Sequence, residues 1–322
     1  MSKVSIVIPN YNGIKYVETC LDALKKQTMK DVEILVIDNG STDGSLELVQ
    51  EKYPEVALVS MGTNTGFCGA VNEGIRRSQS PYVLLLNNDT QAAPTFVEEL
   101  YGAIERDEQI FSCSAKMLQY HDRSRIDDAG DYYCALGWAY ARGKGAPAEK
   151  YDRADDIFFS CAGAAIYRKS ILDQIGSFDE NHFAYLEDAD IGYRARIYGY
   201  RNRYVPQAVV YHVGSASSGS VYNLFKTRHS SRNSIYLIYK NMPFLQILLN
   251  LPLFIPGFLA KTVFFIRKGF GKEYIAGIGR GFLLCRKGKK EGKKVRFRVE
   301  NIGNYMRIQL ELWINVVRRF IK

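Results

Sequence analysis

The sequence predicts an α/β fold in which a mostly parallel sheet is covered by helices on both faces. Apolar runs at 4–8, 34–37 and 82–86 do not alternate with polar residues, which is typical of strands buried on both faces. Segments with helical periodicity separate these runs. Each run also ends in polar, oxygen-bearing side chains. Because ligands bind beyond the carboxyl ends of the strands in such sheets, we expect a functional site at this edge.

Residues 1–90 alternate strand and helix. After the first strand, Val17, Cys20, Leu21 and Leu24 recur at helical spacing. The polar residues 41–43 can cap the helix that follows the second strand. We therefore expect strands near 4–8, 34–37, 56–59 and 82–86, and helices through 17–24, 46–49 and 70–75.

The pattern is weaker between residues 90 and 215. Residues 120–156 are rich in Asp, Gly and Tyr, and we expect an irregular surface segment there that faces the substrate. The other elements are expected as a helix near 94–106, a strand near 111–116, regular structure at 158–166, helices from Ser170 and from near Glu187, and a strand ending at 209–212.

Polar side chains follow the first two strands. Asp38 comes directly after the second strand, where its carboxylate can accept a hydrogen bond from a pyrimidine N–H or a ribose hydroxyl. An ordinary turn or capping aspartate explains the same residue equally well. Asn10, Tyr11 and Asn12 follow the first strand and form a matching wall, in which Tyr11 can pack on a nucleobase.

The fourth strand ends in Asn87, Asn88 and Asp89, which resembles an Asp-x-Asp metal motif with Asn in the first position. Mg²⁺ or Mn²⁺ prefers oxygen ligands, and such an ion can neutralise the charge on a diphosphate leaving group. Asp89 is a single carboxylate, so a second ligand is needed. His212 ends a later strand and is the candidate, although a lone histidine is as often a core or surface imidazole.

The acids Glu187, Asp188 and Asp190 open a helix. Acids in a first turn commonly do no more than stabilise the helix dipole. Alternatively, one of them acts as a general base that takes a proton from an acceptor hydroxyl. Arg194 and Arg196 lie on the same helix and either face a phosphate or pair with these acids.

Taken together, these motifs resemble family 2 glycosyltransferases of the GT-A fold over residues 1 to about 215. The residues that carry the resemblance are 4–12, 36–44, the strand ending in Asn88 and Asp89, and the pair Glu187 and Asp188. Within that family, residues 64–74 and 87–89 are most similar to bacterial rhamnosyltransferases that build surface polysaccharides.

The resemblance implies an inverting transfer of a sugar, with roles for particular residues. Asp188 would be the base, with Glu187 shaping the acceptor pocket, and Asp89 and His212 would hold the divalent cation. The donor would be a nucleotide-diphosphate sugar, dTDP-rhamnose first, and the acceptor a lipid-linked saccharide. A UDP-sugar donor and a non-catalytic nucleotide-sugar-binding scaffold are the alternatives. The implied nucleotide-binding residues are Pro9, Asn10, Tyr11, Asn12, Asp38, Asn39, Ser41, Gly66, Asn72, Asn87 and Asn88.

Charge divides the chain into an expected catalytic domain, 1–215, and a basic, helical, membrane-associating region, 216–322. The C-terminal region holds 21 Lys and Arg against 4 Asp and Glu, although the whole chain has a net charge of only +9. Its apolar stretch 244–266 is interrupted by polar residues and prolines, so we expect a shallow or re-entrant insertion rather than a spanning helix. A basic cluster at 286–298 and an amphipathic stretch at 308–320 follow.

An apolar insertion beside a basic cluster predicts binding to the anionic inner face of a membrane. The eight Lys and Arg of 286–298 would also attract a nucleic acid, but the apolar stretch has no use there, so no nucleic-acid partner is expected. The six cysteines include no Cys-x-x-Cys pair, and the N-terminal residues enter a strand pattern at once. We therefore expect reduced thiols and a peripheral or monotopic location on the cytoplasmic face of the cell membrane.

Overall fold

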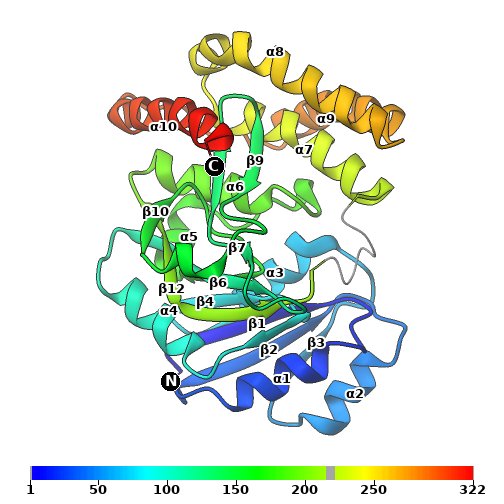
Figure 1. The fold of residues 1–322 in the computed structure, drawn as a ribbon. Coiled ribbons are helices and arrows are strands. Elements are labelled where there is room, and N and C mark those ends of the chain that lie inside the picture. The colour runs from blue at the N-terminus through cyan, green and yellow to red at the C-terminus, as the bar shows by residue number, and fades with distance from the viewer. Residues whose placement is uncertain (1, 215–221, 322) are drawn as a thin grey trace.

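The computed structural model describes residues 2–214 and 222–321, and within them a ten-stranded sheet forms the body of the protein (Figure 1). The strand order along the main path is β10-β12-β6-β11-β4-β1-β2-β3. Strands β3, β2, β1 and β4 are parallel neighbours, which confirms the expected strands in the first ninety residues. The elements of this part are β1 (Val4–Asn10), α1 (Val17–Lys25), β2 (Val32–Asp38), α2 (Ser45–Lys52), β3 (Ala57–Ser60), α3 (Gly66–Arg77) and β4 (Tyr82–Leu86).

The second part of the sheet is mixed. Strand β11 is antiparallel to both of its neighbours, β4 and β6, whereas β12 runs parallel to β6. All strands along the path therefore share one direction except β11 and the edge strand β10. The elements here are β5 (Thr90–Ala92), α4 (Phe96–Glu105), β6 (Ile110–Gln119), β7 (Ile126–Asp128), β10 (Asp155–Ile157), β11 (Ala164–Arg168), α5 (Lys169–Ile175), α6 (Glu187–Ile197) and β12 (Arg201–His212), with η2 (Glu180–His182) before α6.

Apolar side chains bury both faces of the sheet, as the fold prediction requires. On one face, Ile6 and Ile8 pack with residues of α1 and α4. On the other, Val7 and Ile37 pack with residues of α3, α5 and α6. Successive residues of a strand point to opposite faces, which explains why an unbroken apolar run serves both clusters.

The expectation of an irregular segment at 120–156 is wrong. The segment contains β7, which pairs with β6, and a hairpin of β8 (Asp131–Cys134) and β9 (Trp138–Ala141), followed by η1 (Ala148–Tyr151) and β10. Ile126 and Tyr133 are fully buried. These strands have three or four residues each, too few to display a period in the sequence, and their neighbours in the fold stabilise them.

The C-terminal region is helical, and α8 runs without a break through Pro252 and Pro256. The prolines that interrupt the apolar stretch in the sequence do not break the helix: each removes a hydrogen bond, but Gln246, Asn250 and Phe254 form a buried stripe that holds the helix. Among the described residues, α8 alone has the length and composition of a membrane-crossing helix. The helices are α7 (Leu224–Asn241), α8 (Phe244–Arg267), α9 (Gly271–Lys290) and α10 (Ile302–Phe320), with η3 (Val299–Asn301) before α10.

These helices lie at the end of the molecule opposite α1 and α2 (Figure 1). They are packed on the sheet domain through one apolar cluster, in which Leu237 and Leu312 meet Tyr133 and Tyr193. Residues on both sides of the expected 215/216 boundary thus share a core. The division into two domains stays a prediction.

Candidate functional site

The ends of β1, β2 and β4 are joined by three polar side chains. Asn10 and Asp38 are register partners in neighbouring parallel strands, and Asn10 Nδ2 donates to Asp38 Oδ1 over 3.1 Å. Asn88 Nδ2 donates to Asn10 Oδ1 over 2.7 Å. All three are buried. The parallel strands therefore deliver residues far apart in sequence to one edge.

A residue that the sequence analysis did not single out, Gly13, makes room for this arrangement. A Cβ at position 13 would lie 2.1 Å from Asn88 Nδ2 and 2.3 Å from Asn10 Oδ1. Any larger residue would push the two carboxamides apart. An isolated glycine in a loop carries little signal in one sequence, which is why the analysis passed over it.

The loops after β1 and β2 are tied to each other. Asn12 N donates to Ser41 Oγ, and Thr42 N donates to Asn12 Oδ1, each over 2.9 Å. Asp38 Oδ2 accepts from Ser41 N over 3.1 Å, so Asp38 acts as a turn aspartate in addition to any role toward a ligand. Tyr11 stands 40% exposed beside this loop pair, and Pro9 lies within β1.

Asn39 holds the loop before α3. Its Nδ2 donates to Gly66 O over 3.0 Å, and its Oδ1 accepts from Thr65 N over 2.9 Å. Asn72 binds a different segment. Its carboxamide donates to Phe178 O over 2.8 Å and accepts from Phe178 N over 3.1 Å. The structure thus gives Asn39 and Gly66 a shared loop, and Asn72 a contact with the segment before η2.

The second part of the site is a line of three side chains at the end of β12. His212 Nε2 lies 3.3 Å from Asp89 Oδ1, and His212 Nδ1 lies 2.7 Å from Asp127 Oδ2. Lys144 Nζ contacts the other oxygen of Asp127 at 2.8 Å. Despite burial, the two carboxylates raise the pKa of His212 to about 9.

This donor set fits a divalent cation such as Mg²⁺ or Mn²⁺. Asp89 offers a carboxylate oxygen, and His212 offers Nε2 once a bound cation has displaced its proton; the two atoms face each other. A carboxylate on the remaining ring nitrogen, here Asp127, is the usual device that orients a metal-binding histidine. Asp127 was missed because it lies in the segment expected to be irregular. The adjacent acids at 127 and 128, next to an apolar residue, were the available signal.

A second group of ligand atoms lies nearby. Oxygens of Asp128 and Asp131 and the sulfur of Cys161 lie within 4.8 Å of one another. Burial is the main cause that raises the pKa of Asp128 to about 7, and burial together with the nearby Asp128 raises the pKa of Asp131 well above its usual range. The group could hold a cation, with two carboxylates and one thiol.

Asp188 lies next to the end of β4. Its Oδ1 accepts from Ala189 N over 2.7 Å, and the N–H of Ala162 also hydrogen-bonds to it. The neighbouring Gly163 O accepts from Asn87 N over 2.9 Å. The Asn87–Asp89 segment and Asp188 are thus connected through residues 162 and 163. Burial raises the pKa of Asp188 to about 6, within range for a general base.

Among the other charged residues of α6, Asp190, Arg194 and Arg196 have structural partners, whereas Glu187 Oε2 is buried without one. Burial and the adjacent Asp188 raise the pKa of Glu187 well above its usual range. Asp190 pairs with Lys240 at 2.8 Å and with Arg194 at 2.9 Å. Arg194 also donates to three backbone carbonyls between 175 and 177, and Arg196 pairs with Glu311. Arg194 therefore pairs with an acid of its own helix, as one alternative expected, whereas Arg196 pairs with an acid of α10.

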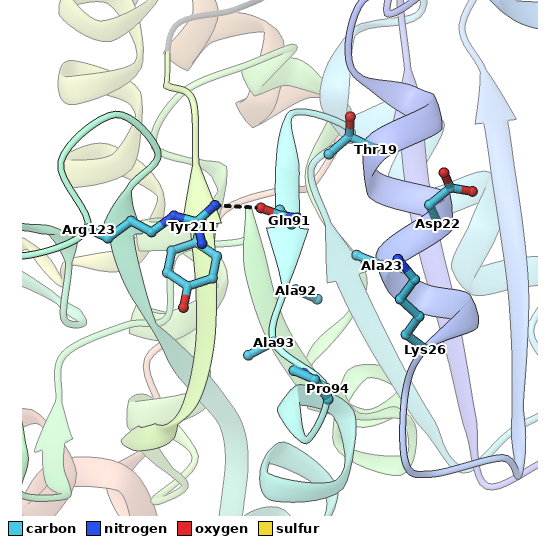
Figure 2. Close-up of a pocket in the computed structure, with 10 residues that line it drawn as sticks. All are labelled: Thr19, Asp22, Ala23, Lys26, Gln91, Ala92, Ala93, Pro94, Arg123 and Tyr211. Carbon is cyan, nitrogen blue, oxygen red and sulfur yellow. Dashed lines mark hydrogen bonds between the residues drawn. The ribbon is translucent and has the colours of Figure 1, made fainter.

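A surface groove between α1, β5 and β12 is separate from this site. Figure 2 shows its lining, where Arg123 donates to Gln91 over 2.8 Å beside the ring of Tyr211. Tyr211 and His212 are successive residues of β12, so their side chains point to opposite faces of the sheet. The groove therefore lies on the face away from His212.

Comparisons with known proteins give the family and the fold of the chain. The family model described as "Glycosyl transferase family 2" matches residues 5–176. Over 237 residues the chain is 28% identical to the N-acetylglucosaminyl-diphospho-decaprenol L-rhamnosyltransferase of Mycobacterium tuberculosis, covering 66% of this chain and 77% of that protein. The matched family range ends before Glu187, so the positions of Asp188 and His212 come from the structure rather than from that match.

Two solved structures share the fold. One is GalNAc-T7 with UDP, GalNAc and Mn²⁺, at a TM-score of 0.60 and 16% identity over 74% of this chain. The other is Staphylococcus aureus TarS, at a TM-score of 0.54 and 19% identity over 79% of this chain. The alignments span 48% and 43% of those longer chains. The expected GT-A fold is confirmed.

Proposed function

Because the chain belongs to glycosyltransferase family 2, we propose that it transfers rhamnose with inversion from dTDP-rhamnose to a lipid-linked saccharide. The single observation that carries the reaction type is the line of contacts from Asp38 through Asn10 and Asn88 to the neighbouring Asp89 and His212. The sugar and acceptor rest on the Mycobacterium tuberculosis relative, whose name specifies an L-rhamnosyltransferase and a diphospho-decaprenol.

The residues divide the chemistry among them. Asp38 and Asn10 orient the nucleoside, with Tyr11 against its base. Asp89 and His212 would hold the cation, which when bound neutralises negative charge on the diphosphate. Asp188 accepts the proton of the acceptor hydroxyl, whose oxygen forms the new bond to the anomeric carbon. The bond from that carbon to the diphosphate oxygen breaks, and the nucleoside diphosphate departs. A single displacement of this kind inverts the anomeric configuration and needs no covalent nucleophile.

The geometry around Asp188 supports its role as the base. Two backbone N–H groups hold its carboxylate in a fixed orientation. The carboxylates of Asp128 and Asp131 lie in the same region. Asp188 is among the charges that raise the pKa of Asp131. We place the acceptor hydroxyl between Asp188 and the Asp128–Asp131 group, where several carboxylates can bind sugar hydroxyls.

The test is a donor panel with Mn²⁺ and with Mg²⁺. Purified full-length protein is incubated with a diphospholipid-linked N-acetylglucosamine acceptor and dTDP-rhamnose, UDP-glucose, UDP-galactose or UDP-N-acetylglucosamine. The proposal is supported if transfer of rhamnose from dTDP-rhamnose exceeds sugar transfer from every UDP-sugar. Transfer from a UDP-sugar instead would replace the donor assignment. Nucleotide-sugar binding without transfer or hydrolysis would identify a non-catalytic binder.

We also propose that the C-terminal helices bind the cytoplasmic face of a membrane as a monotopic surface. Two polar residues of α8 face the protein: Asn250 exchanges hydrogen bonds with Gln309 of α10, and Gln246 accepts from Tyr193 of α6. The opposite side of α8 is apolar and exposed. Lateral attachment through its polar side favours a helix lying in the interface over one that crosses the bilayer. The exposed apolar residues of α8 and α10 include Leu245, Leu248, Leu259, Met306, Leu310, Ile314 and Val317.

A further inference from the structure

The turn that precedes Asp188 has an unusual backbone. Phe183 has φ 62° and ψ −60°, and Ala184 N donates to His182 O over 2.7 Å, which closes a γ-turn of the rare positive-φ kind. Tyr185 and Leu186 follow with φ of 70° and 67°. Residues other than glycine keep such conformations only where surrounding contacts impose them. Helix α6 and its Asp188 begin directly after this turn.

The contacts that impose it come largely from one buried side chain of α7. Asn233 Nδ2 lies 2.9 Å from His182 O, 2.9 Å from Ala184 O and 2.7 Å from Tyr185 O. Arg232 Nε donates to Asn233 Oδ1 over 2.9 Å, which orients the amide with its N–H groups toward the turn. Arg232 Nη2 adds a bond to His182 O at 2.7 Å. Four of these contacts reach the turn, and the donor of each lies on α7.

The opposite side of the turn contacts the start of α3. Phe183 O accepts from Cys68 N over 3.2 Å, and a Cβ on Gly66 would lie 2.6 Å from Phe183. The ring of Phe183 also stacks on His229 of α7 with centroids 5.3 Å apart. The turn is thus clamped between α7 and the glycine-containing loop that the sequence analysis assigned to the donor.

We propose that Asn233, oriented by Arg232, is a positioning residue that holds turn 182–186 so that Asp188 faces the acceptor. As far as it concerns Asp188, this inference rests on the proposed function. Helix α7 lies outside the expected catalytic domain, yet under this proposal it orients Asp188. The C-terminal region then takes part in catalysis in addition to any membrane contact.

The test compares Asn233→Asp with Ser234→Ala. Aspartate has the shape of asparagine but lacks the N–H donors. Ser234 is an equally buried neighbour whose hydroxyl bonds to Ser230 O within α7, so its loss leaves the turn untouched. Hydrogen exchange of peptides covering 180–190 is measured by mass spectrometry, with peptides covering 4–38 as an internal reference. We expect exchange in 180–190 to be at least tenfold faster in N233D and unchanged in S234A.

Kinetics provide the second measurement. The maximal rate is divided by the concentration of sites that bind nucleoside diphosphate, which calorimetry measures. The resulting normalised kcat is then unaffected by any loss of folded protein. We expect this normalised kcat to fall at least tenfold in N233D, with the donor KM within twofold of wild type. If N233D does not fold, Arg232→Lys replaces it, because it removes the Nε donor that orients the amide.

The outcomes separate the two proposals. If the wild-type protein transfers no sugar, the proposed function fails, while the exchange measurement still tests the hold on the turn. The role of Asn233 in holding turn 182–186 would be overturned if hydrogen exchange in N233D equalled that of the wild type. The same holds for R232K where that variant replaces N233D. Faster exchange with unchanged normalised kcat would overturn the positioning role.

Discussion

His212 Nδ1 lies 2.7 Å from Asp127 Oδ2, so a carboxylate in the middle of β7 orients the imidazole at the end of β12. The other ring nitrogen thereby faces Asp89. This relationship leads to the first prediction. Asp127→Asn should weaken the binding of Mn²⁺ about 10- to 100-fold, because the His212 ring loses the carboxylate that orients it and makes it more basic. Titration of Mn²⁺ against nucleoside-diphosphate binding measures this. Asp122→Asn, at an exposed position on the neighbouring loop, is the control, and equal Mn²⁺ dependence in the two variants would contradict the assignment.

Asp188→Asn should abolish most transfer while leaving donor binding intact. Loss of a general base lowers kcat by about 10²–10⁴-fold. The nucleoside diphosphate contacts other residues, so its Kd should stay within about twofold by calorimetry. Turnover close to wild type would remove Asp188 from the role of base.

The rate of transfer should depend on pH through the same carboxyl. Burial raises the pKa of Asp188 to about 6, and a base must be deprotonated to act. The rate should therefore be nearly constant above pH 7 and fall as the pH drops through about 6. A pH–rate profile of kcat at saturating Mn²⁺ measures it. A profile that stays flat down to pH 5 would contradict the prediction.

Gly13→Ala should disrupt the carboxamide pair at the edge of the sheet. The added Cβ would overlap Asn88 and Asn10, and such overpacking costs about 1–3 kcal/mol of unfolding free energy. Nucleotide affinity should fall as well. Gly102→Ala is the matched control: it lies inside α4 with no atom near its Cβ direction, so alanine should stabilise the helix by about 0.5–1 kcal/mol. Urea unfolding and calorimetry compare the two. Equal stability of the Gly13→Ala and Gly102→Ala variants would contradict the prediction, because it would mean that the carboxamide pair accommodates the added Cβ.

Lys240→Met should destabilise the whole chain. Lys240 is buried and pairs with Asp190 and Asp179 at 2.8 Å each, which ties α7 to α6 and to the segment before it. Breaking a buried pair costs about 3–5 kcal/mol. Lys287→Met, which loses an exposed pair with Glu291, should cost less than about 0.5 kcal/mol. The comparison is made by thermal unfolding, and similar Tm values for both variants would contradict it.

Leu248→Gln with Leu259→Gln should weaken membrane binding. Both residues are exposed on α8, and burying a leucine in an apolar phase is worth about 1.5–3 kcal/mol. Flotation with phosphatidylglycerol-containing vesicles should therefore fall at least tenfold. Ala57→Gln, at an exposed site on β3, should float like wild type. Flotation that is unaffected by the double variant would place the contact elsewhere.

Much of the fold could be predicted from local pattern. Three of the four parallel strands of the first ninety residues, β1, β2 and β4, are apolar runs long enough to show their type, and the polar residues at their ends follow directly. Parallel strands end at one edge, so the meeting of Asn10, Asp38 and Asn88 was implied as soon as the strands were assigned.

Contacts between distant segments were not visible in this way. Asp127 reaches His212 because β7 and β12 both pair with β6, a pairing that no short-range pattern encodes. Asn233 reaches the turn before Asp188 for the same kind of reason, since α7 packs against α6 through a shared apolar cluster. Periodicity records which face of an element is buried, and therefore specifies strands, helices and strand-end residues. Which partner covers that face depends on packing across the whole chain, and this packing places the histidine, its carboxylate and the strained turn.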